Sequence, residues 1–415
     1  MREIKKLTLD NLEDYVDLAY NAYPSFKDNS KEGRKSFSQL ATLRITDPDS
    51  HFMGMFEDDK LIAAMRMINF KMNFFGKIIP ASGLASVAVH LMHKKEKIAK
   101  TLVEYYEEHY LKQEIPIASL LPFTPEFYKK MGYGLGIKMN QYRIPAKRFP
   151  AYYDKVDLRF LKASDDMSAL LDFHQSIVNK THGMYAKIID ERFDLAENLD
   201  NRIIVSYDEN KAIDGYMIFE FINGKDDNYT INNMHIRELQ YSNSQSLDKF
   251  LGFIKKQEDQ VNLVIYESQD EYFAHKIDNP LNDSLNYVDY GNLETNTQLI
   301  GIMYKILDVR MAFKQAAHRN YNNVNLAVCF EIKDEKNLET QTIVAFKGGQ
   351  IDLDSKEYDV LVKMSIVDFS SLFVGCISAI GLYKLGLLKL DKPECLEQLD
   401  LAFYCQHRPI CNTDF

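Results

Sequence analysis

The chain has 415 residues, which at the usual domain size predicts about two to four domains. Apolar residues make up 46% of it, enough to build real cores and too many for a disordered chain. The net charge of -10 is unfavourable for a general nucleic-acid binder, and it suits a cationic small molecule better.

The cysteines and the apolar runs indicate the cellular compartment of the protein. The five cysteines all lie in the last quarter of the chain and form no CxxC pair, so we expect reduced thiols in a cytosol, with neither a disulfide framework nor a zinc site. The N-terminal sequence MREIKKLTLDNLED lacks the apolar stretch of a signal peptide. The most apolar run, residues 369–383, is too short for a membrane span and predicts a buried helix. We therefore expect a cytoplasmic protein without a membrane span.

The first part, residues 1–150, has an α/β pattern. In chain order it predicts a strand over 3–7, a helix from Asp10, strands over 51–56 and 61–72, a strand over 84–89, a helix over 96–112 and a strand over 115–123. The two strands from 51 to 72 flank the turn Asp58–Lys60 and form a hairpin.

The middle part, residues 151–290, repeats this plan faintly. Strands over 203–207 and 216–222 precede a strand over 235–241, the turn SNSQS, a helix LDKFLGFIKKQ and a strand VNLVIYE. The order matches that of residues 87–120, although this turn has neither a basic residue nor a glycine. Two interpretations stay open here: a duplicated domain that lost a phosphate site, or an unrelated α/β unit.

The last part, residues 291–415, differs from both. It predicts a long amphipathic helix over LIGIMYKILDVRMAFKQAA, strands over 325–332, 342–346 and 350–353, and then apolar helices. The segment LDLAFYCQ near the end is strand-like. An open sheet with apolar helices resembles a sterol-carrier-protein-like fold, whose interior is either a lipid tunnel or a plain core.

The segment from residue 84 to 134 carries the chemistry. The apolar strand LASVAV leads into HLMHKKEKIAK, which opens a helix, and the strand IPIASLLPF and FYKKMGYG follow. A helix N-terminus offers unpaired N–H groups and the positive end of its dipole, so a basic turn at this position predicts a pyrophosphate site.

This order of parts resembles the GCN5-related N-acetyltransferases (GNAT), which bind acetyl-coenzyme A at such a turn. The resemblance implies that the backbone of Val87, Ala88 and Val89 holds the pantetheine arm and that Phe123 and Thr124 also contact the coenzyme. The turn itself would comprise Lys94, Lys95, Glu96, Lys97, Ile98, Ala99 and Lys100. Lys95 and Lys97 stand where the family has glycines, which tolerate positive φ and close approach of a phosphate.

The resemblance also implies a general acid. A phenol near the thioester sulfur can protonate the departing thiolate. FYKKMGYG offers Tyr128 and Tyr133, and by position in the superfamily Tyr128 is the candidate.

Two acetyltransferase units, one degenerate, before a sterol-carrier-like domain and an aromatic last residue resemble the Eis (enhanced intracellular survival) family along the whole chain. That resemblance implies that the α-carboxylate of Phe415 is the general base. Since an α-carboxyl has a pKa near 3.5, it needs desolvation to act near neutral pH. Asp414 is either a ligand of a cationic substrate or an ordinary exposed carboxylate. The resemblance further implies a homo-oligomer, a hexamer.

We therefore expect two tandem GNAT-type domains, residues 1–150 and 151–290, followed by a sterol-carrier-protein-like domain, residues 291–415. The expected activity is transfer of the acetyl group of acetyl-CoA to a primary amine of an aminoglycoside, a polyamine or a protein lysine. No metal is expected, because His90 and His93 lack further ligands. The alternative is a non-catalytic protein that binds an apolar ligand or lipid in its last domain; stabilisation by acetyl-CoA would separate the two.

Overall fold

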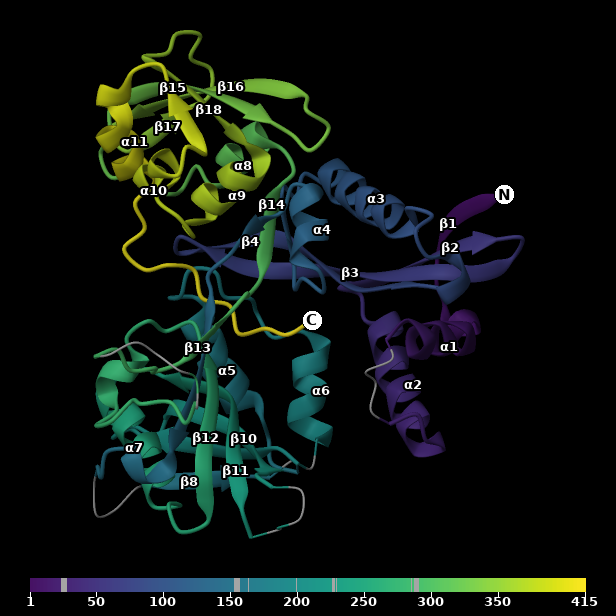
Figure 1. Ribbon diagram of the computed structural model, residues 1–415, viewed down its shortest axis with the longest axis vertical. Coiled ribbons are helices and arrows are strands. Elements are labelled where there is room, and N and C mark those ends of the chain that lie inside the picture. Colours follow the sequence, from purple (N-terminus) through teal and green to yellow (C-terminus); the bar gives the residue numbers. More distant parts are fainter. Residues whose placement is uncertain are drawn as a thin grey trace.

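The computed structural model describes residues 1–23, 28–152, 157–162, 164–198, 200–225, 228, 230–284, 286 and 291–415. The structure contains three β-sheets, each packed with its own helices (Figure 1). A sheet together with its helices is called a layer below, numbered first to third in chain order. Within the residues that the structure describes, no helix is long and apolar enough to cross a membrane. The apolar run at 369–383 is divided between α9 (Ile366–Val374) and α10 (Ala379–Lys384).

The first sheet has seven strands in the order β1-β2-β3-β4-β5-β14-β6. Their bounds are β1 Arg2–Lys6, β2 Ser50–Glu57, β3 Lys60–Phe74, β4 Lys77–Val89, β5 Ile117–Leu120, β6 Gly134–Leu135 and β14 Met303–Ile306. Strands β4 and β5 pair in parallel. Helices α3 (Ile98–Lys112) and α4 (Pro125–Lys130) lie on one face of this sheet, and α1 (Leu12–Ala22) and α2 (Lys31–Thr46) lie on the other (Figure 1).

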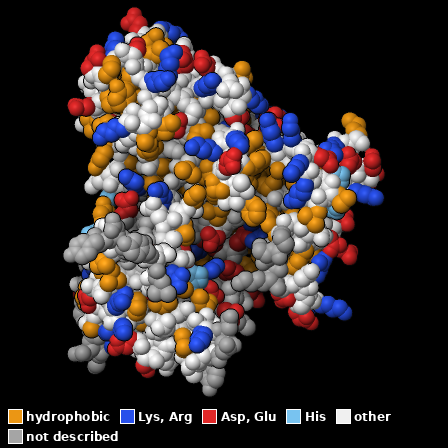
Figure 2. All heavy atoms as spheres, in the orientation of Figure 1, with side chains coloured by type: hydrophobic (Ala, Val, Ile, Leu, Met, Phe, Trp, Pro, Cys, Tyr) orange, Lys and Arg blue, Asp and Glu red, His pale blue; other side chains and the backbone are white. Residues whose placement is uncertain are grey.

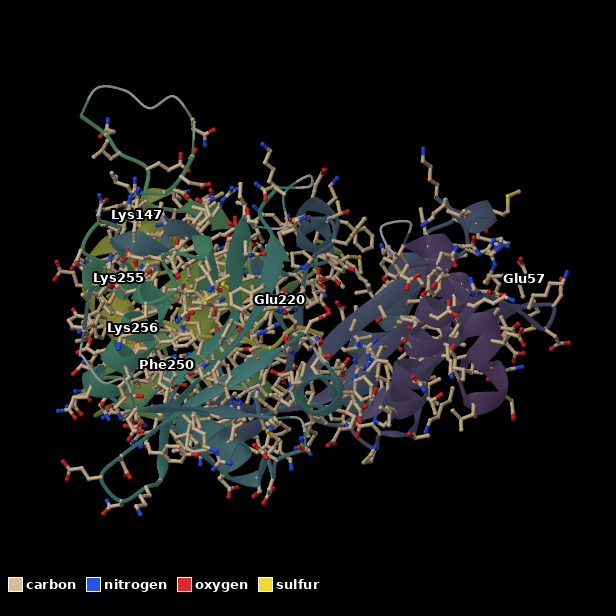
Figure 3. The ribbon with its side chains drawn as sticks, turned by 90° about the horizontal axis from the view of Figure 1, so that it is seen from below. Glu57, Lys147, Glu220, Phe250, Lys255 and Lys256 are labelled. Atoms are coloured by element: carbon tan, nitrogen blue, oxygen red, sulfur yellow. The ribbon has the colours of Figure 1, made fainter. Side chains whose placement is uncertain are left out.

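The second sheet also has seven strands, in the order β13-β7-β12-β11-β10-β9-β8. They are β7 Met139–Pro145, β8 Leu158–Leu161, β9 Arg202–Tyr207, β10 Ile213–Asn223, β11 Asn232–Tyr241, β12 Val261–Ser268 and β13 Thr297–Leu299. Its helices are α5 Ser168–Val178, α6 Ile189–Glu197 and α7 Ser244–Lys255. The last turn of α7 is fastened to the segment after β7, because the Lys255 ammonium donates to the Lys147 carbonyl at 2.7 Å (Figure 3).

The third sheet has five strands in the order β17-β16-β15-β18-β19. They are β15 Leu326–Lys333, β16 Glu339–Lys347, β17 Gln350–Asp352, β18 Val360–Ser365 and β19 Leu388–Leu390. Helices α8 (Val309–Gln315), α9, α10 and α11 (Leu396–Phe403) pack on it.

Two elements differ from the sequence predictions. The long helix expected over residues 299–317 is wrong: β13, β14 and the short α8 occupy this segment. All four residues of β14 are buried, and the strand pairs with β5 on one side and β6 on the other. A strand covered on both faces is apolar at successive positions, so its pattern does not separate strand from helix. The strand-like LDLAFYCQ is also wrong, since most of it lies in α11.

The first two sheets each contain a strand from beyond the domain boundaries expected at residues 150 and 290. Strand β7, before residue 150, belongs to the second sheet, and β14, after residue 290, belongs to the first. Residue 290 itself lies outside the described residues. A buried ion-pair cluster joins the first two layers: Arg66 donates to both carboxylate oxygens of Asp190 on α6, at 3.0 and 2.6 Å, and Arg44 of α2 pairs with the same carboxylate.

Residues 404–415 contain no helix or strand. They lead from α11 in the third layer across the molecule and end between the first sheet and α6 (Figure 1). The chain end therefore lies far from the domain that precedes it.

Candidate active site

A cavity of about 690 Å³ opens where β4 and β5 separate. The two strands pair at only three positions, from Ser82 with Ala118 to Leu84 with Leu120; beyond them β5 ends while β4 continues. Ten of the expected coenzyme residues line this cavity: Val87, Val89, Lys94, Lys95, Lys97, Ile98, Ala99, Lys100, Phe123 and Thr124. The structure thus brings the strand end, the basic turn and the segment after β5 together.

Ala88 and Glu96, also expected at the coenzyme, do not line the cavity. Ala88 pairs with Ala64 on β3 and is buried in a cluster with Tyr15 and Phe52. The Glu96 carboxylate is paired with Arg2, which also bonds Glu57 at the outer end of the first domain (Figure 3). The hydrogen bond from Arg2 lowers the pKa of the Glu96 carboxyl, which therefore stays ionised and paired with Arg2.

The basic turn keeps the backbone of a glycine turn without its glycines. Lys95 has φ 66° and Lys97 has φ 63°, both in the left-handed region that glycine adopts most easily. Lys97 is the N-cap of α3 and makes no side-chain cap, and the first turn of α3 contains no acidic residue. The helix N-terminus therefore presents N–H groups without a capping side chain, next to three lysines, and suits a phosphate.

These lysines carry charge that the protein does not neutralise. Within the described part of the chain, Lys94, Lys95 and Lys97 form no ion pair, while Lys100 lies 3.9 Å from Glu104. The cavity is thus positively charged at the turn and apolar along β4.

Tyr128 lies on α4 and lines the same cavity, with 8% of its surface exposed. Burial raises the pKa of its hydroxyl to about 12, so the phenol holds its proton at neutral pH. Tyr133 is fully buried and does not line the cavity. The position of Tyr128, rather than that of Tyr133, is the one from which a proton can be donated into the cavity.

Phe415 reaches this cavity from the other end of the sequence. Its ring packs edge-on against Phe70 of β3, with centroids 4.8 Å apart. Phe70 in turn stacks on Tyr185 at 4.2 Å. Gly83 leaves space for this aromatic group, because a Cβ there would lie 2.2 Å from the Phe70 ring and 3.1 Å from the Phe415 ring.

A second cavity, of about 430 Å³, adjoins the first and shares Phe415, Arg44 and Leu121 with it. Its lining includes five carboxylates: Asp190, Glu191, Asp194, Glu238 and Asp414. Figure 2 shows acidic side chains gathered in the hollow between the first sheet and α6.

Three of these carboxylates are paired with cations, two of them with the same lysine. Asp190 bonds Arg66 and Arg44, while Glu238 and Glu191 contact Lys187 at 2.9 and 3.1 Å. Among the described residues, Asp194 and Asp414 form no ion pair within 4 Å. Desolvation raises the pKa of both carboxyls, and the nearby Arg237 opposes this effect in both. Asp194 and Asp414 are therefore the carboxylates of this cavity without a directly paired cation among the described residues, although Arg237 lines the same cavity.

At the corresponding place in the second layer, a side chain caps the helix. Strands β11 and β12 pair in parallel and α7 follows β11, as α3 follows β4. Here Asn243 accepts a hydrogen bond from the Ser246 N–H at 2.9 Å, and the buried Ser246 hydroxyl lies 2.7 Å from that of Ser206. A capping side chain occupies the N–H group that a phosphate would use, and the turn has no cation.

Several lining residues were not predicted from the sequence. Tyr23 donates its hydroxyl proton to the Val87 carbonyl at 2.9 Å, and Arg44 and Asp194 come from α2 and α6. In helix α2 only Ala41 is fully buried, but Phe37, Ala41 and Ile45 recur at helical spacing and pack in one cluster. This spacing indicates the helix without indicating that Arg44 reaches the cavity. In the described ranges, no group of three His, Cys, Asp or Glu residues is placed to hold a metal ion.

Comparison with known proteins identifies the class. Residues 3–136 match one family model described as an acetyltransferase (GNAT) domain, and residues 178–293 match another with the same description. No curated protein matches the chain.

Solved structures match the chain over its whole length, and three of them serve as examples. A GCN5-related N-acetyltransferase from Anabaena variabilis has 17% identity and a TM-score of 0.81, with 100% of both chains covered. A conserved protein of unknown function from Enterococcus faecalis, a probable N-acyltransferase, has 17% identity and a TM-score of 0.79 at the same coverage. Eis1 from Mycobacterium abscessus has 16% identity and a TM-score of 0.75, again at full coverage.

The chain is therefore an acyltransferase that depends on acetyl-CoA, built on two tandem GNAT domains. It shares its fold over its full length with Eis1. The predicted GNAT resemblance and the duplicated second unit are confirmed.

Proposed function

We propose that the protein transfers the acetyl group of acetyl-CoA to a primary amine of a cationic acceptor: an aminoglycoside, a polyamine or a protein lysine. The observation that carries this proposal is that Tyr128 and Phe415, 287 positions apart in the sequence, line one cavity with the basic turn. The adjoining acidic cavity reaches the same Phe415 and suits an ammonium group.

The coenzyme supplies an activated acetyl thioester. The uncapped N–H groups of α3 and the lysines of the turn would hold its phosphates, and the free part of β4 around Val87 and Val89 would pair with its amide arm, as in strand addition. Phe123, 85% exposed at the cavity, would contact it from the other side.

The acid and base come from opposite ends of the chain. The α-carboxylate of Phe415 would accept a proton from the acceptor ammonium, directly or through water, and so free the amine for attack on the acetyl carbonyl. Tyr128, which burial keeps protonated at neutral pH, would then give its proton to the departing sulfur. Asp414, with Asp194 beside the same cavity, would hold further positive charge of the acceptor.

Other features of this proposal rest on the Eis-like resemblance. These are a homo-oligomer, specifically a hexamer, a cytoplasmic location, and a sterol-carrier-protein-like third domain; neither nucleic acid nor membrane is a proposed partner. The interior of the third domain favours a plain core over a lipid tunnel. The Phe313 ring lies 5.6 Å from Phe330 and 5.2 Å from Phe373, so aromatic rings occupy this space.

Two matched variants test the proposal. Tyr128→Phe should lower kcat for amine acetylation by a factor of about 10²–10⁴, measured as thiol release, while Tyr133→Phe should not. Both should keep the increase in Tm that acetyl-CoA produces, since a ligand of the native state stabilises it by mass action. An absent Tm increase in the wild type, or equal kcat in the two variants, would contradict the proposal.

A further inference from the structure

The segment that carries Phe415 is fastened shortly before its end. The Ile410 N–H donates to the His182 carbonyl at 2.8 Å, and the Cys411 N–H donates to the Gln269 Oε1 at 2.6 Å. The side chains of Cys411 and Thr413 are both 6% exposed. Residues 409–413 are therefore held against the second domain although they form no strand.

Gln269 follows β12 and is 4% exposed. Its Oε1 accepts from the tail, and its Nε2 donates to the Ile137 carbonyl at 3.4 Å. Because the second contact fixes which way the amide points, the acceptor oxygen faces the tail. A buried N–H without an acceptor is costly, so the Cys411 N–H depends on this oxygen.

His182 joins three parts of the molecule at one residue. Its Nδ1 accepts from the Phe75 N–H at 3.2 Å, between β3 and β4, and its Nε2 donates to the carbonyl of Val374, the last residue of α9, at 2.9 Å. Its ring also stacks on Phe75 at 3.9 Å. With the ring fixed on both sides, the backbone carbonyl of His182 is held toward the tail.

Gly183 allows the tail to lie directly on this segment. It has φ +94°, and a Cβ there would lie 2.6 Å from Pro409 Cβ and 2.8 Å from the Ile410 nitrogen. Any side chain at this position would displace the tail.

We propose that His182, Gly183 and Gln269 form a clasp that positions the C-terminal tail, so that Phe415 lies in the coenzyme cavity. They are positioning residues: they act on the reaction through the tail. This inference rests on the proposed role of the Phe415 carboxylate as base, and it adds what sets that carboxylate in place.

Gln269→Met tests the clasp, because methionine fills the space of glutamine without the acceptor oxygen. Hydrogen exchange of the tail amides in residues 404–415 should become roughly tenfold faster, and kcat should fall by a similar factor, with the acetyl-CoA-induced Tm increase retained. Gln315→Met is the matched control: this glutamine also bonds a backbone carbonyl, that of Pro80 at 3.1 Å, and its variant should match the wild type in both measurements.

A further variant covers the case in which Gln269→Met does not fold. Gly183→Ala leaves Gln269 in place and should also accelerate exchange. Wild-type exchange in Gln269→Met or in Gly183→Ala would overturn the clasp. Accelerated exchange with unchanged kcat would overturn the positioning role and the base role of Phe415 together. Loss of the acetyl-CoA effect in the wild type would instead contradict the proposed function.

Discussion

Lys95 allows the backbone and the charge of the coenzyme turn to be separated. Its side chain is exposed, so Lys95→Gly and Lys95→Ala remove the same ammonium and no packing. A left-handed L-residue costs about 1–2 kcal/mol, which alanine keeps and glycine relieves. Glycine loses roughly 0.5–1 kcal/mol of this gain because its unfolded chain is freer. We therefore expect the free energy of unfolding to be about 0.5–1 kcal/mol higher for glycine than for alanine.

Calorimetry of both variants, with and without acetyl-CoA, measures this difference. Glycine should have the higher Tm by about 1 °C. Both should lose coenzyme affinity equally, by about 0.5 kcal/mol for one exposed charge near a phosphate in water. Lys94 is the control, because its φ is an ordinary −64°; there glycine should be no more stable than alanine. An alanine variant at 95 as stable as the glycine variant would refute a left-handed turn.

Three more predictions concern the tail and the acidic cavity. Adding a few residues after Phe415 moves the α-carboxylate away and should lower kcat at least tenfold without changing acetyl-CoA affinity; intact kcat would contradict its role as base. Burial lowers the pKa of His182 to about 4, so the unfolded chain binds its proton at higher pH than the folded one. The free energy of unfolding should therefore be unaffected by this histidine above about pH 6.5 and fall by up to about 3 kcal/mol toward pH 4. In His182→Gln, Tm measured against pH should depend less on pH over this range. Asp414→Asn should raise the KM for a diamine several-fold and leave the KM for acetyl-CoA unchanged. A diamine KM equal to that of the wild type would make Asp414 an ordinary exposed carboxylate.

The sequence predicts those parts of the fold whose pattern is local. The spacing of Ile98 and Leu102 predicts helix α3, and the structure buries both; it buries Tyr106 and Tyr110 where the sequence predicted Tyr105 and His109. The hairpin of β2 and β3 follows from its polar turn. Strand β14 was beyond such reasoning, because its neighbours β5 and β6 lie more than 160 residues away in the sequence.

The candidate site shows a different limit. Lys95 and Lys97 lack the signal that glycine gives, yet their backbone adopts the glycine conformation. The sequence therefore indicates the type of site, but not that its turn adopts the backbone conformation of a glycine turn. Arg44 and Asp194 reach the candidate site because whole helices pack beside it, and no spacing of residues along the chain predicts such contacts.

Strand β14 has a consequence for how this architecture is inherited and built. Residues 303–306 fill the gap between β5 and β6, although the whole second domain is synthesised in between. The first sheet thus stays open during translation until the second domain has emerged, and an excised first domain would expose two unpaired strand edges, a template for aggregation. The two units are therefore not interchangeable: the second sheet takes all its strands from residues 139–299, whereas the first unit cannot be cut out as one segment without losing β14.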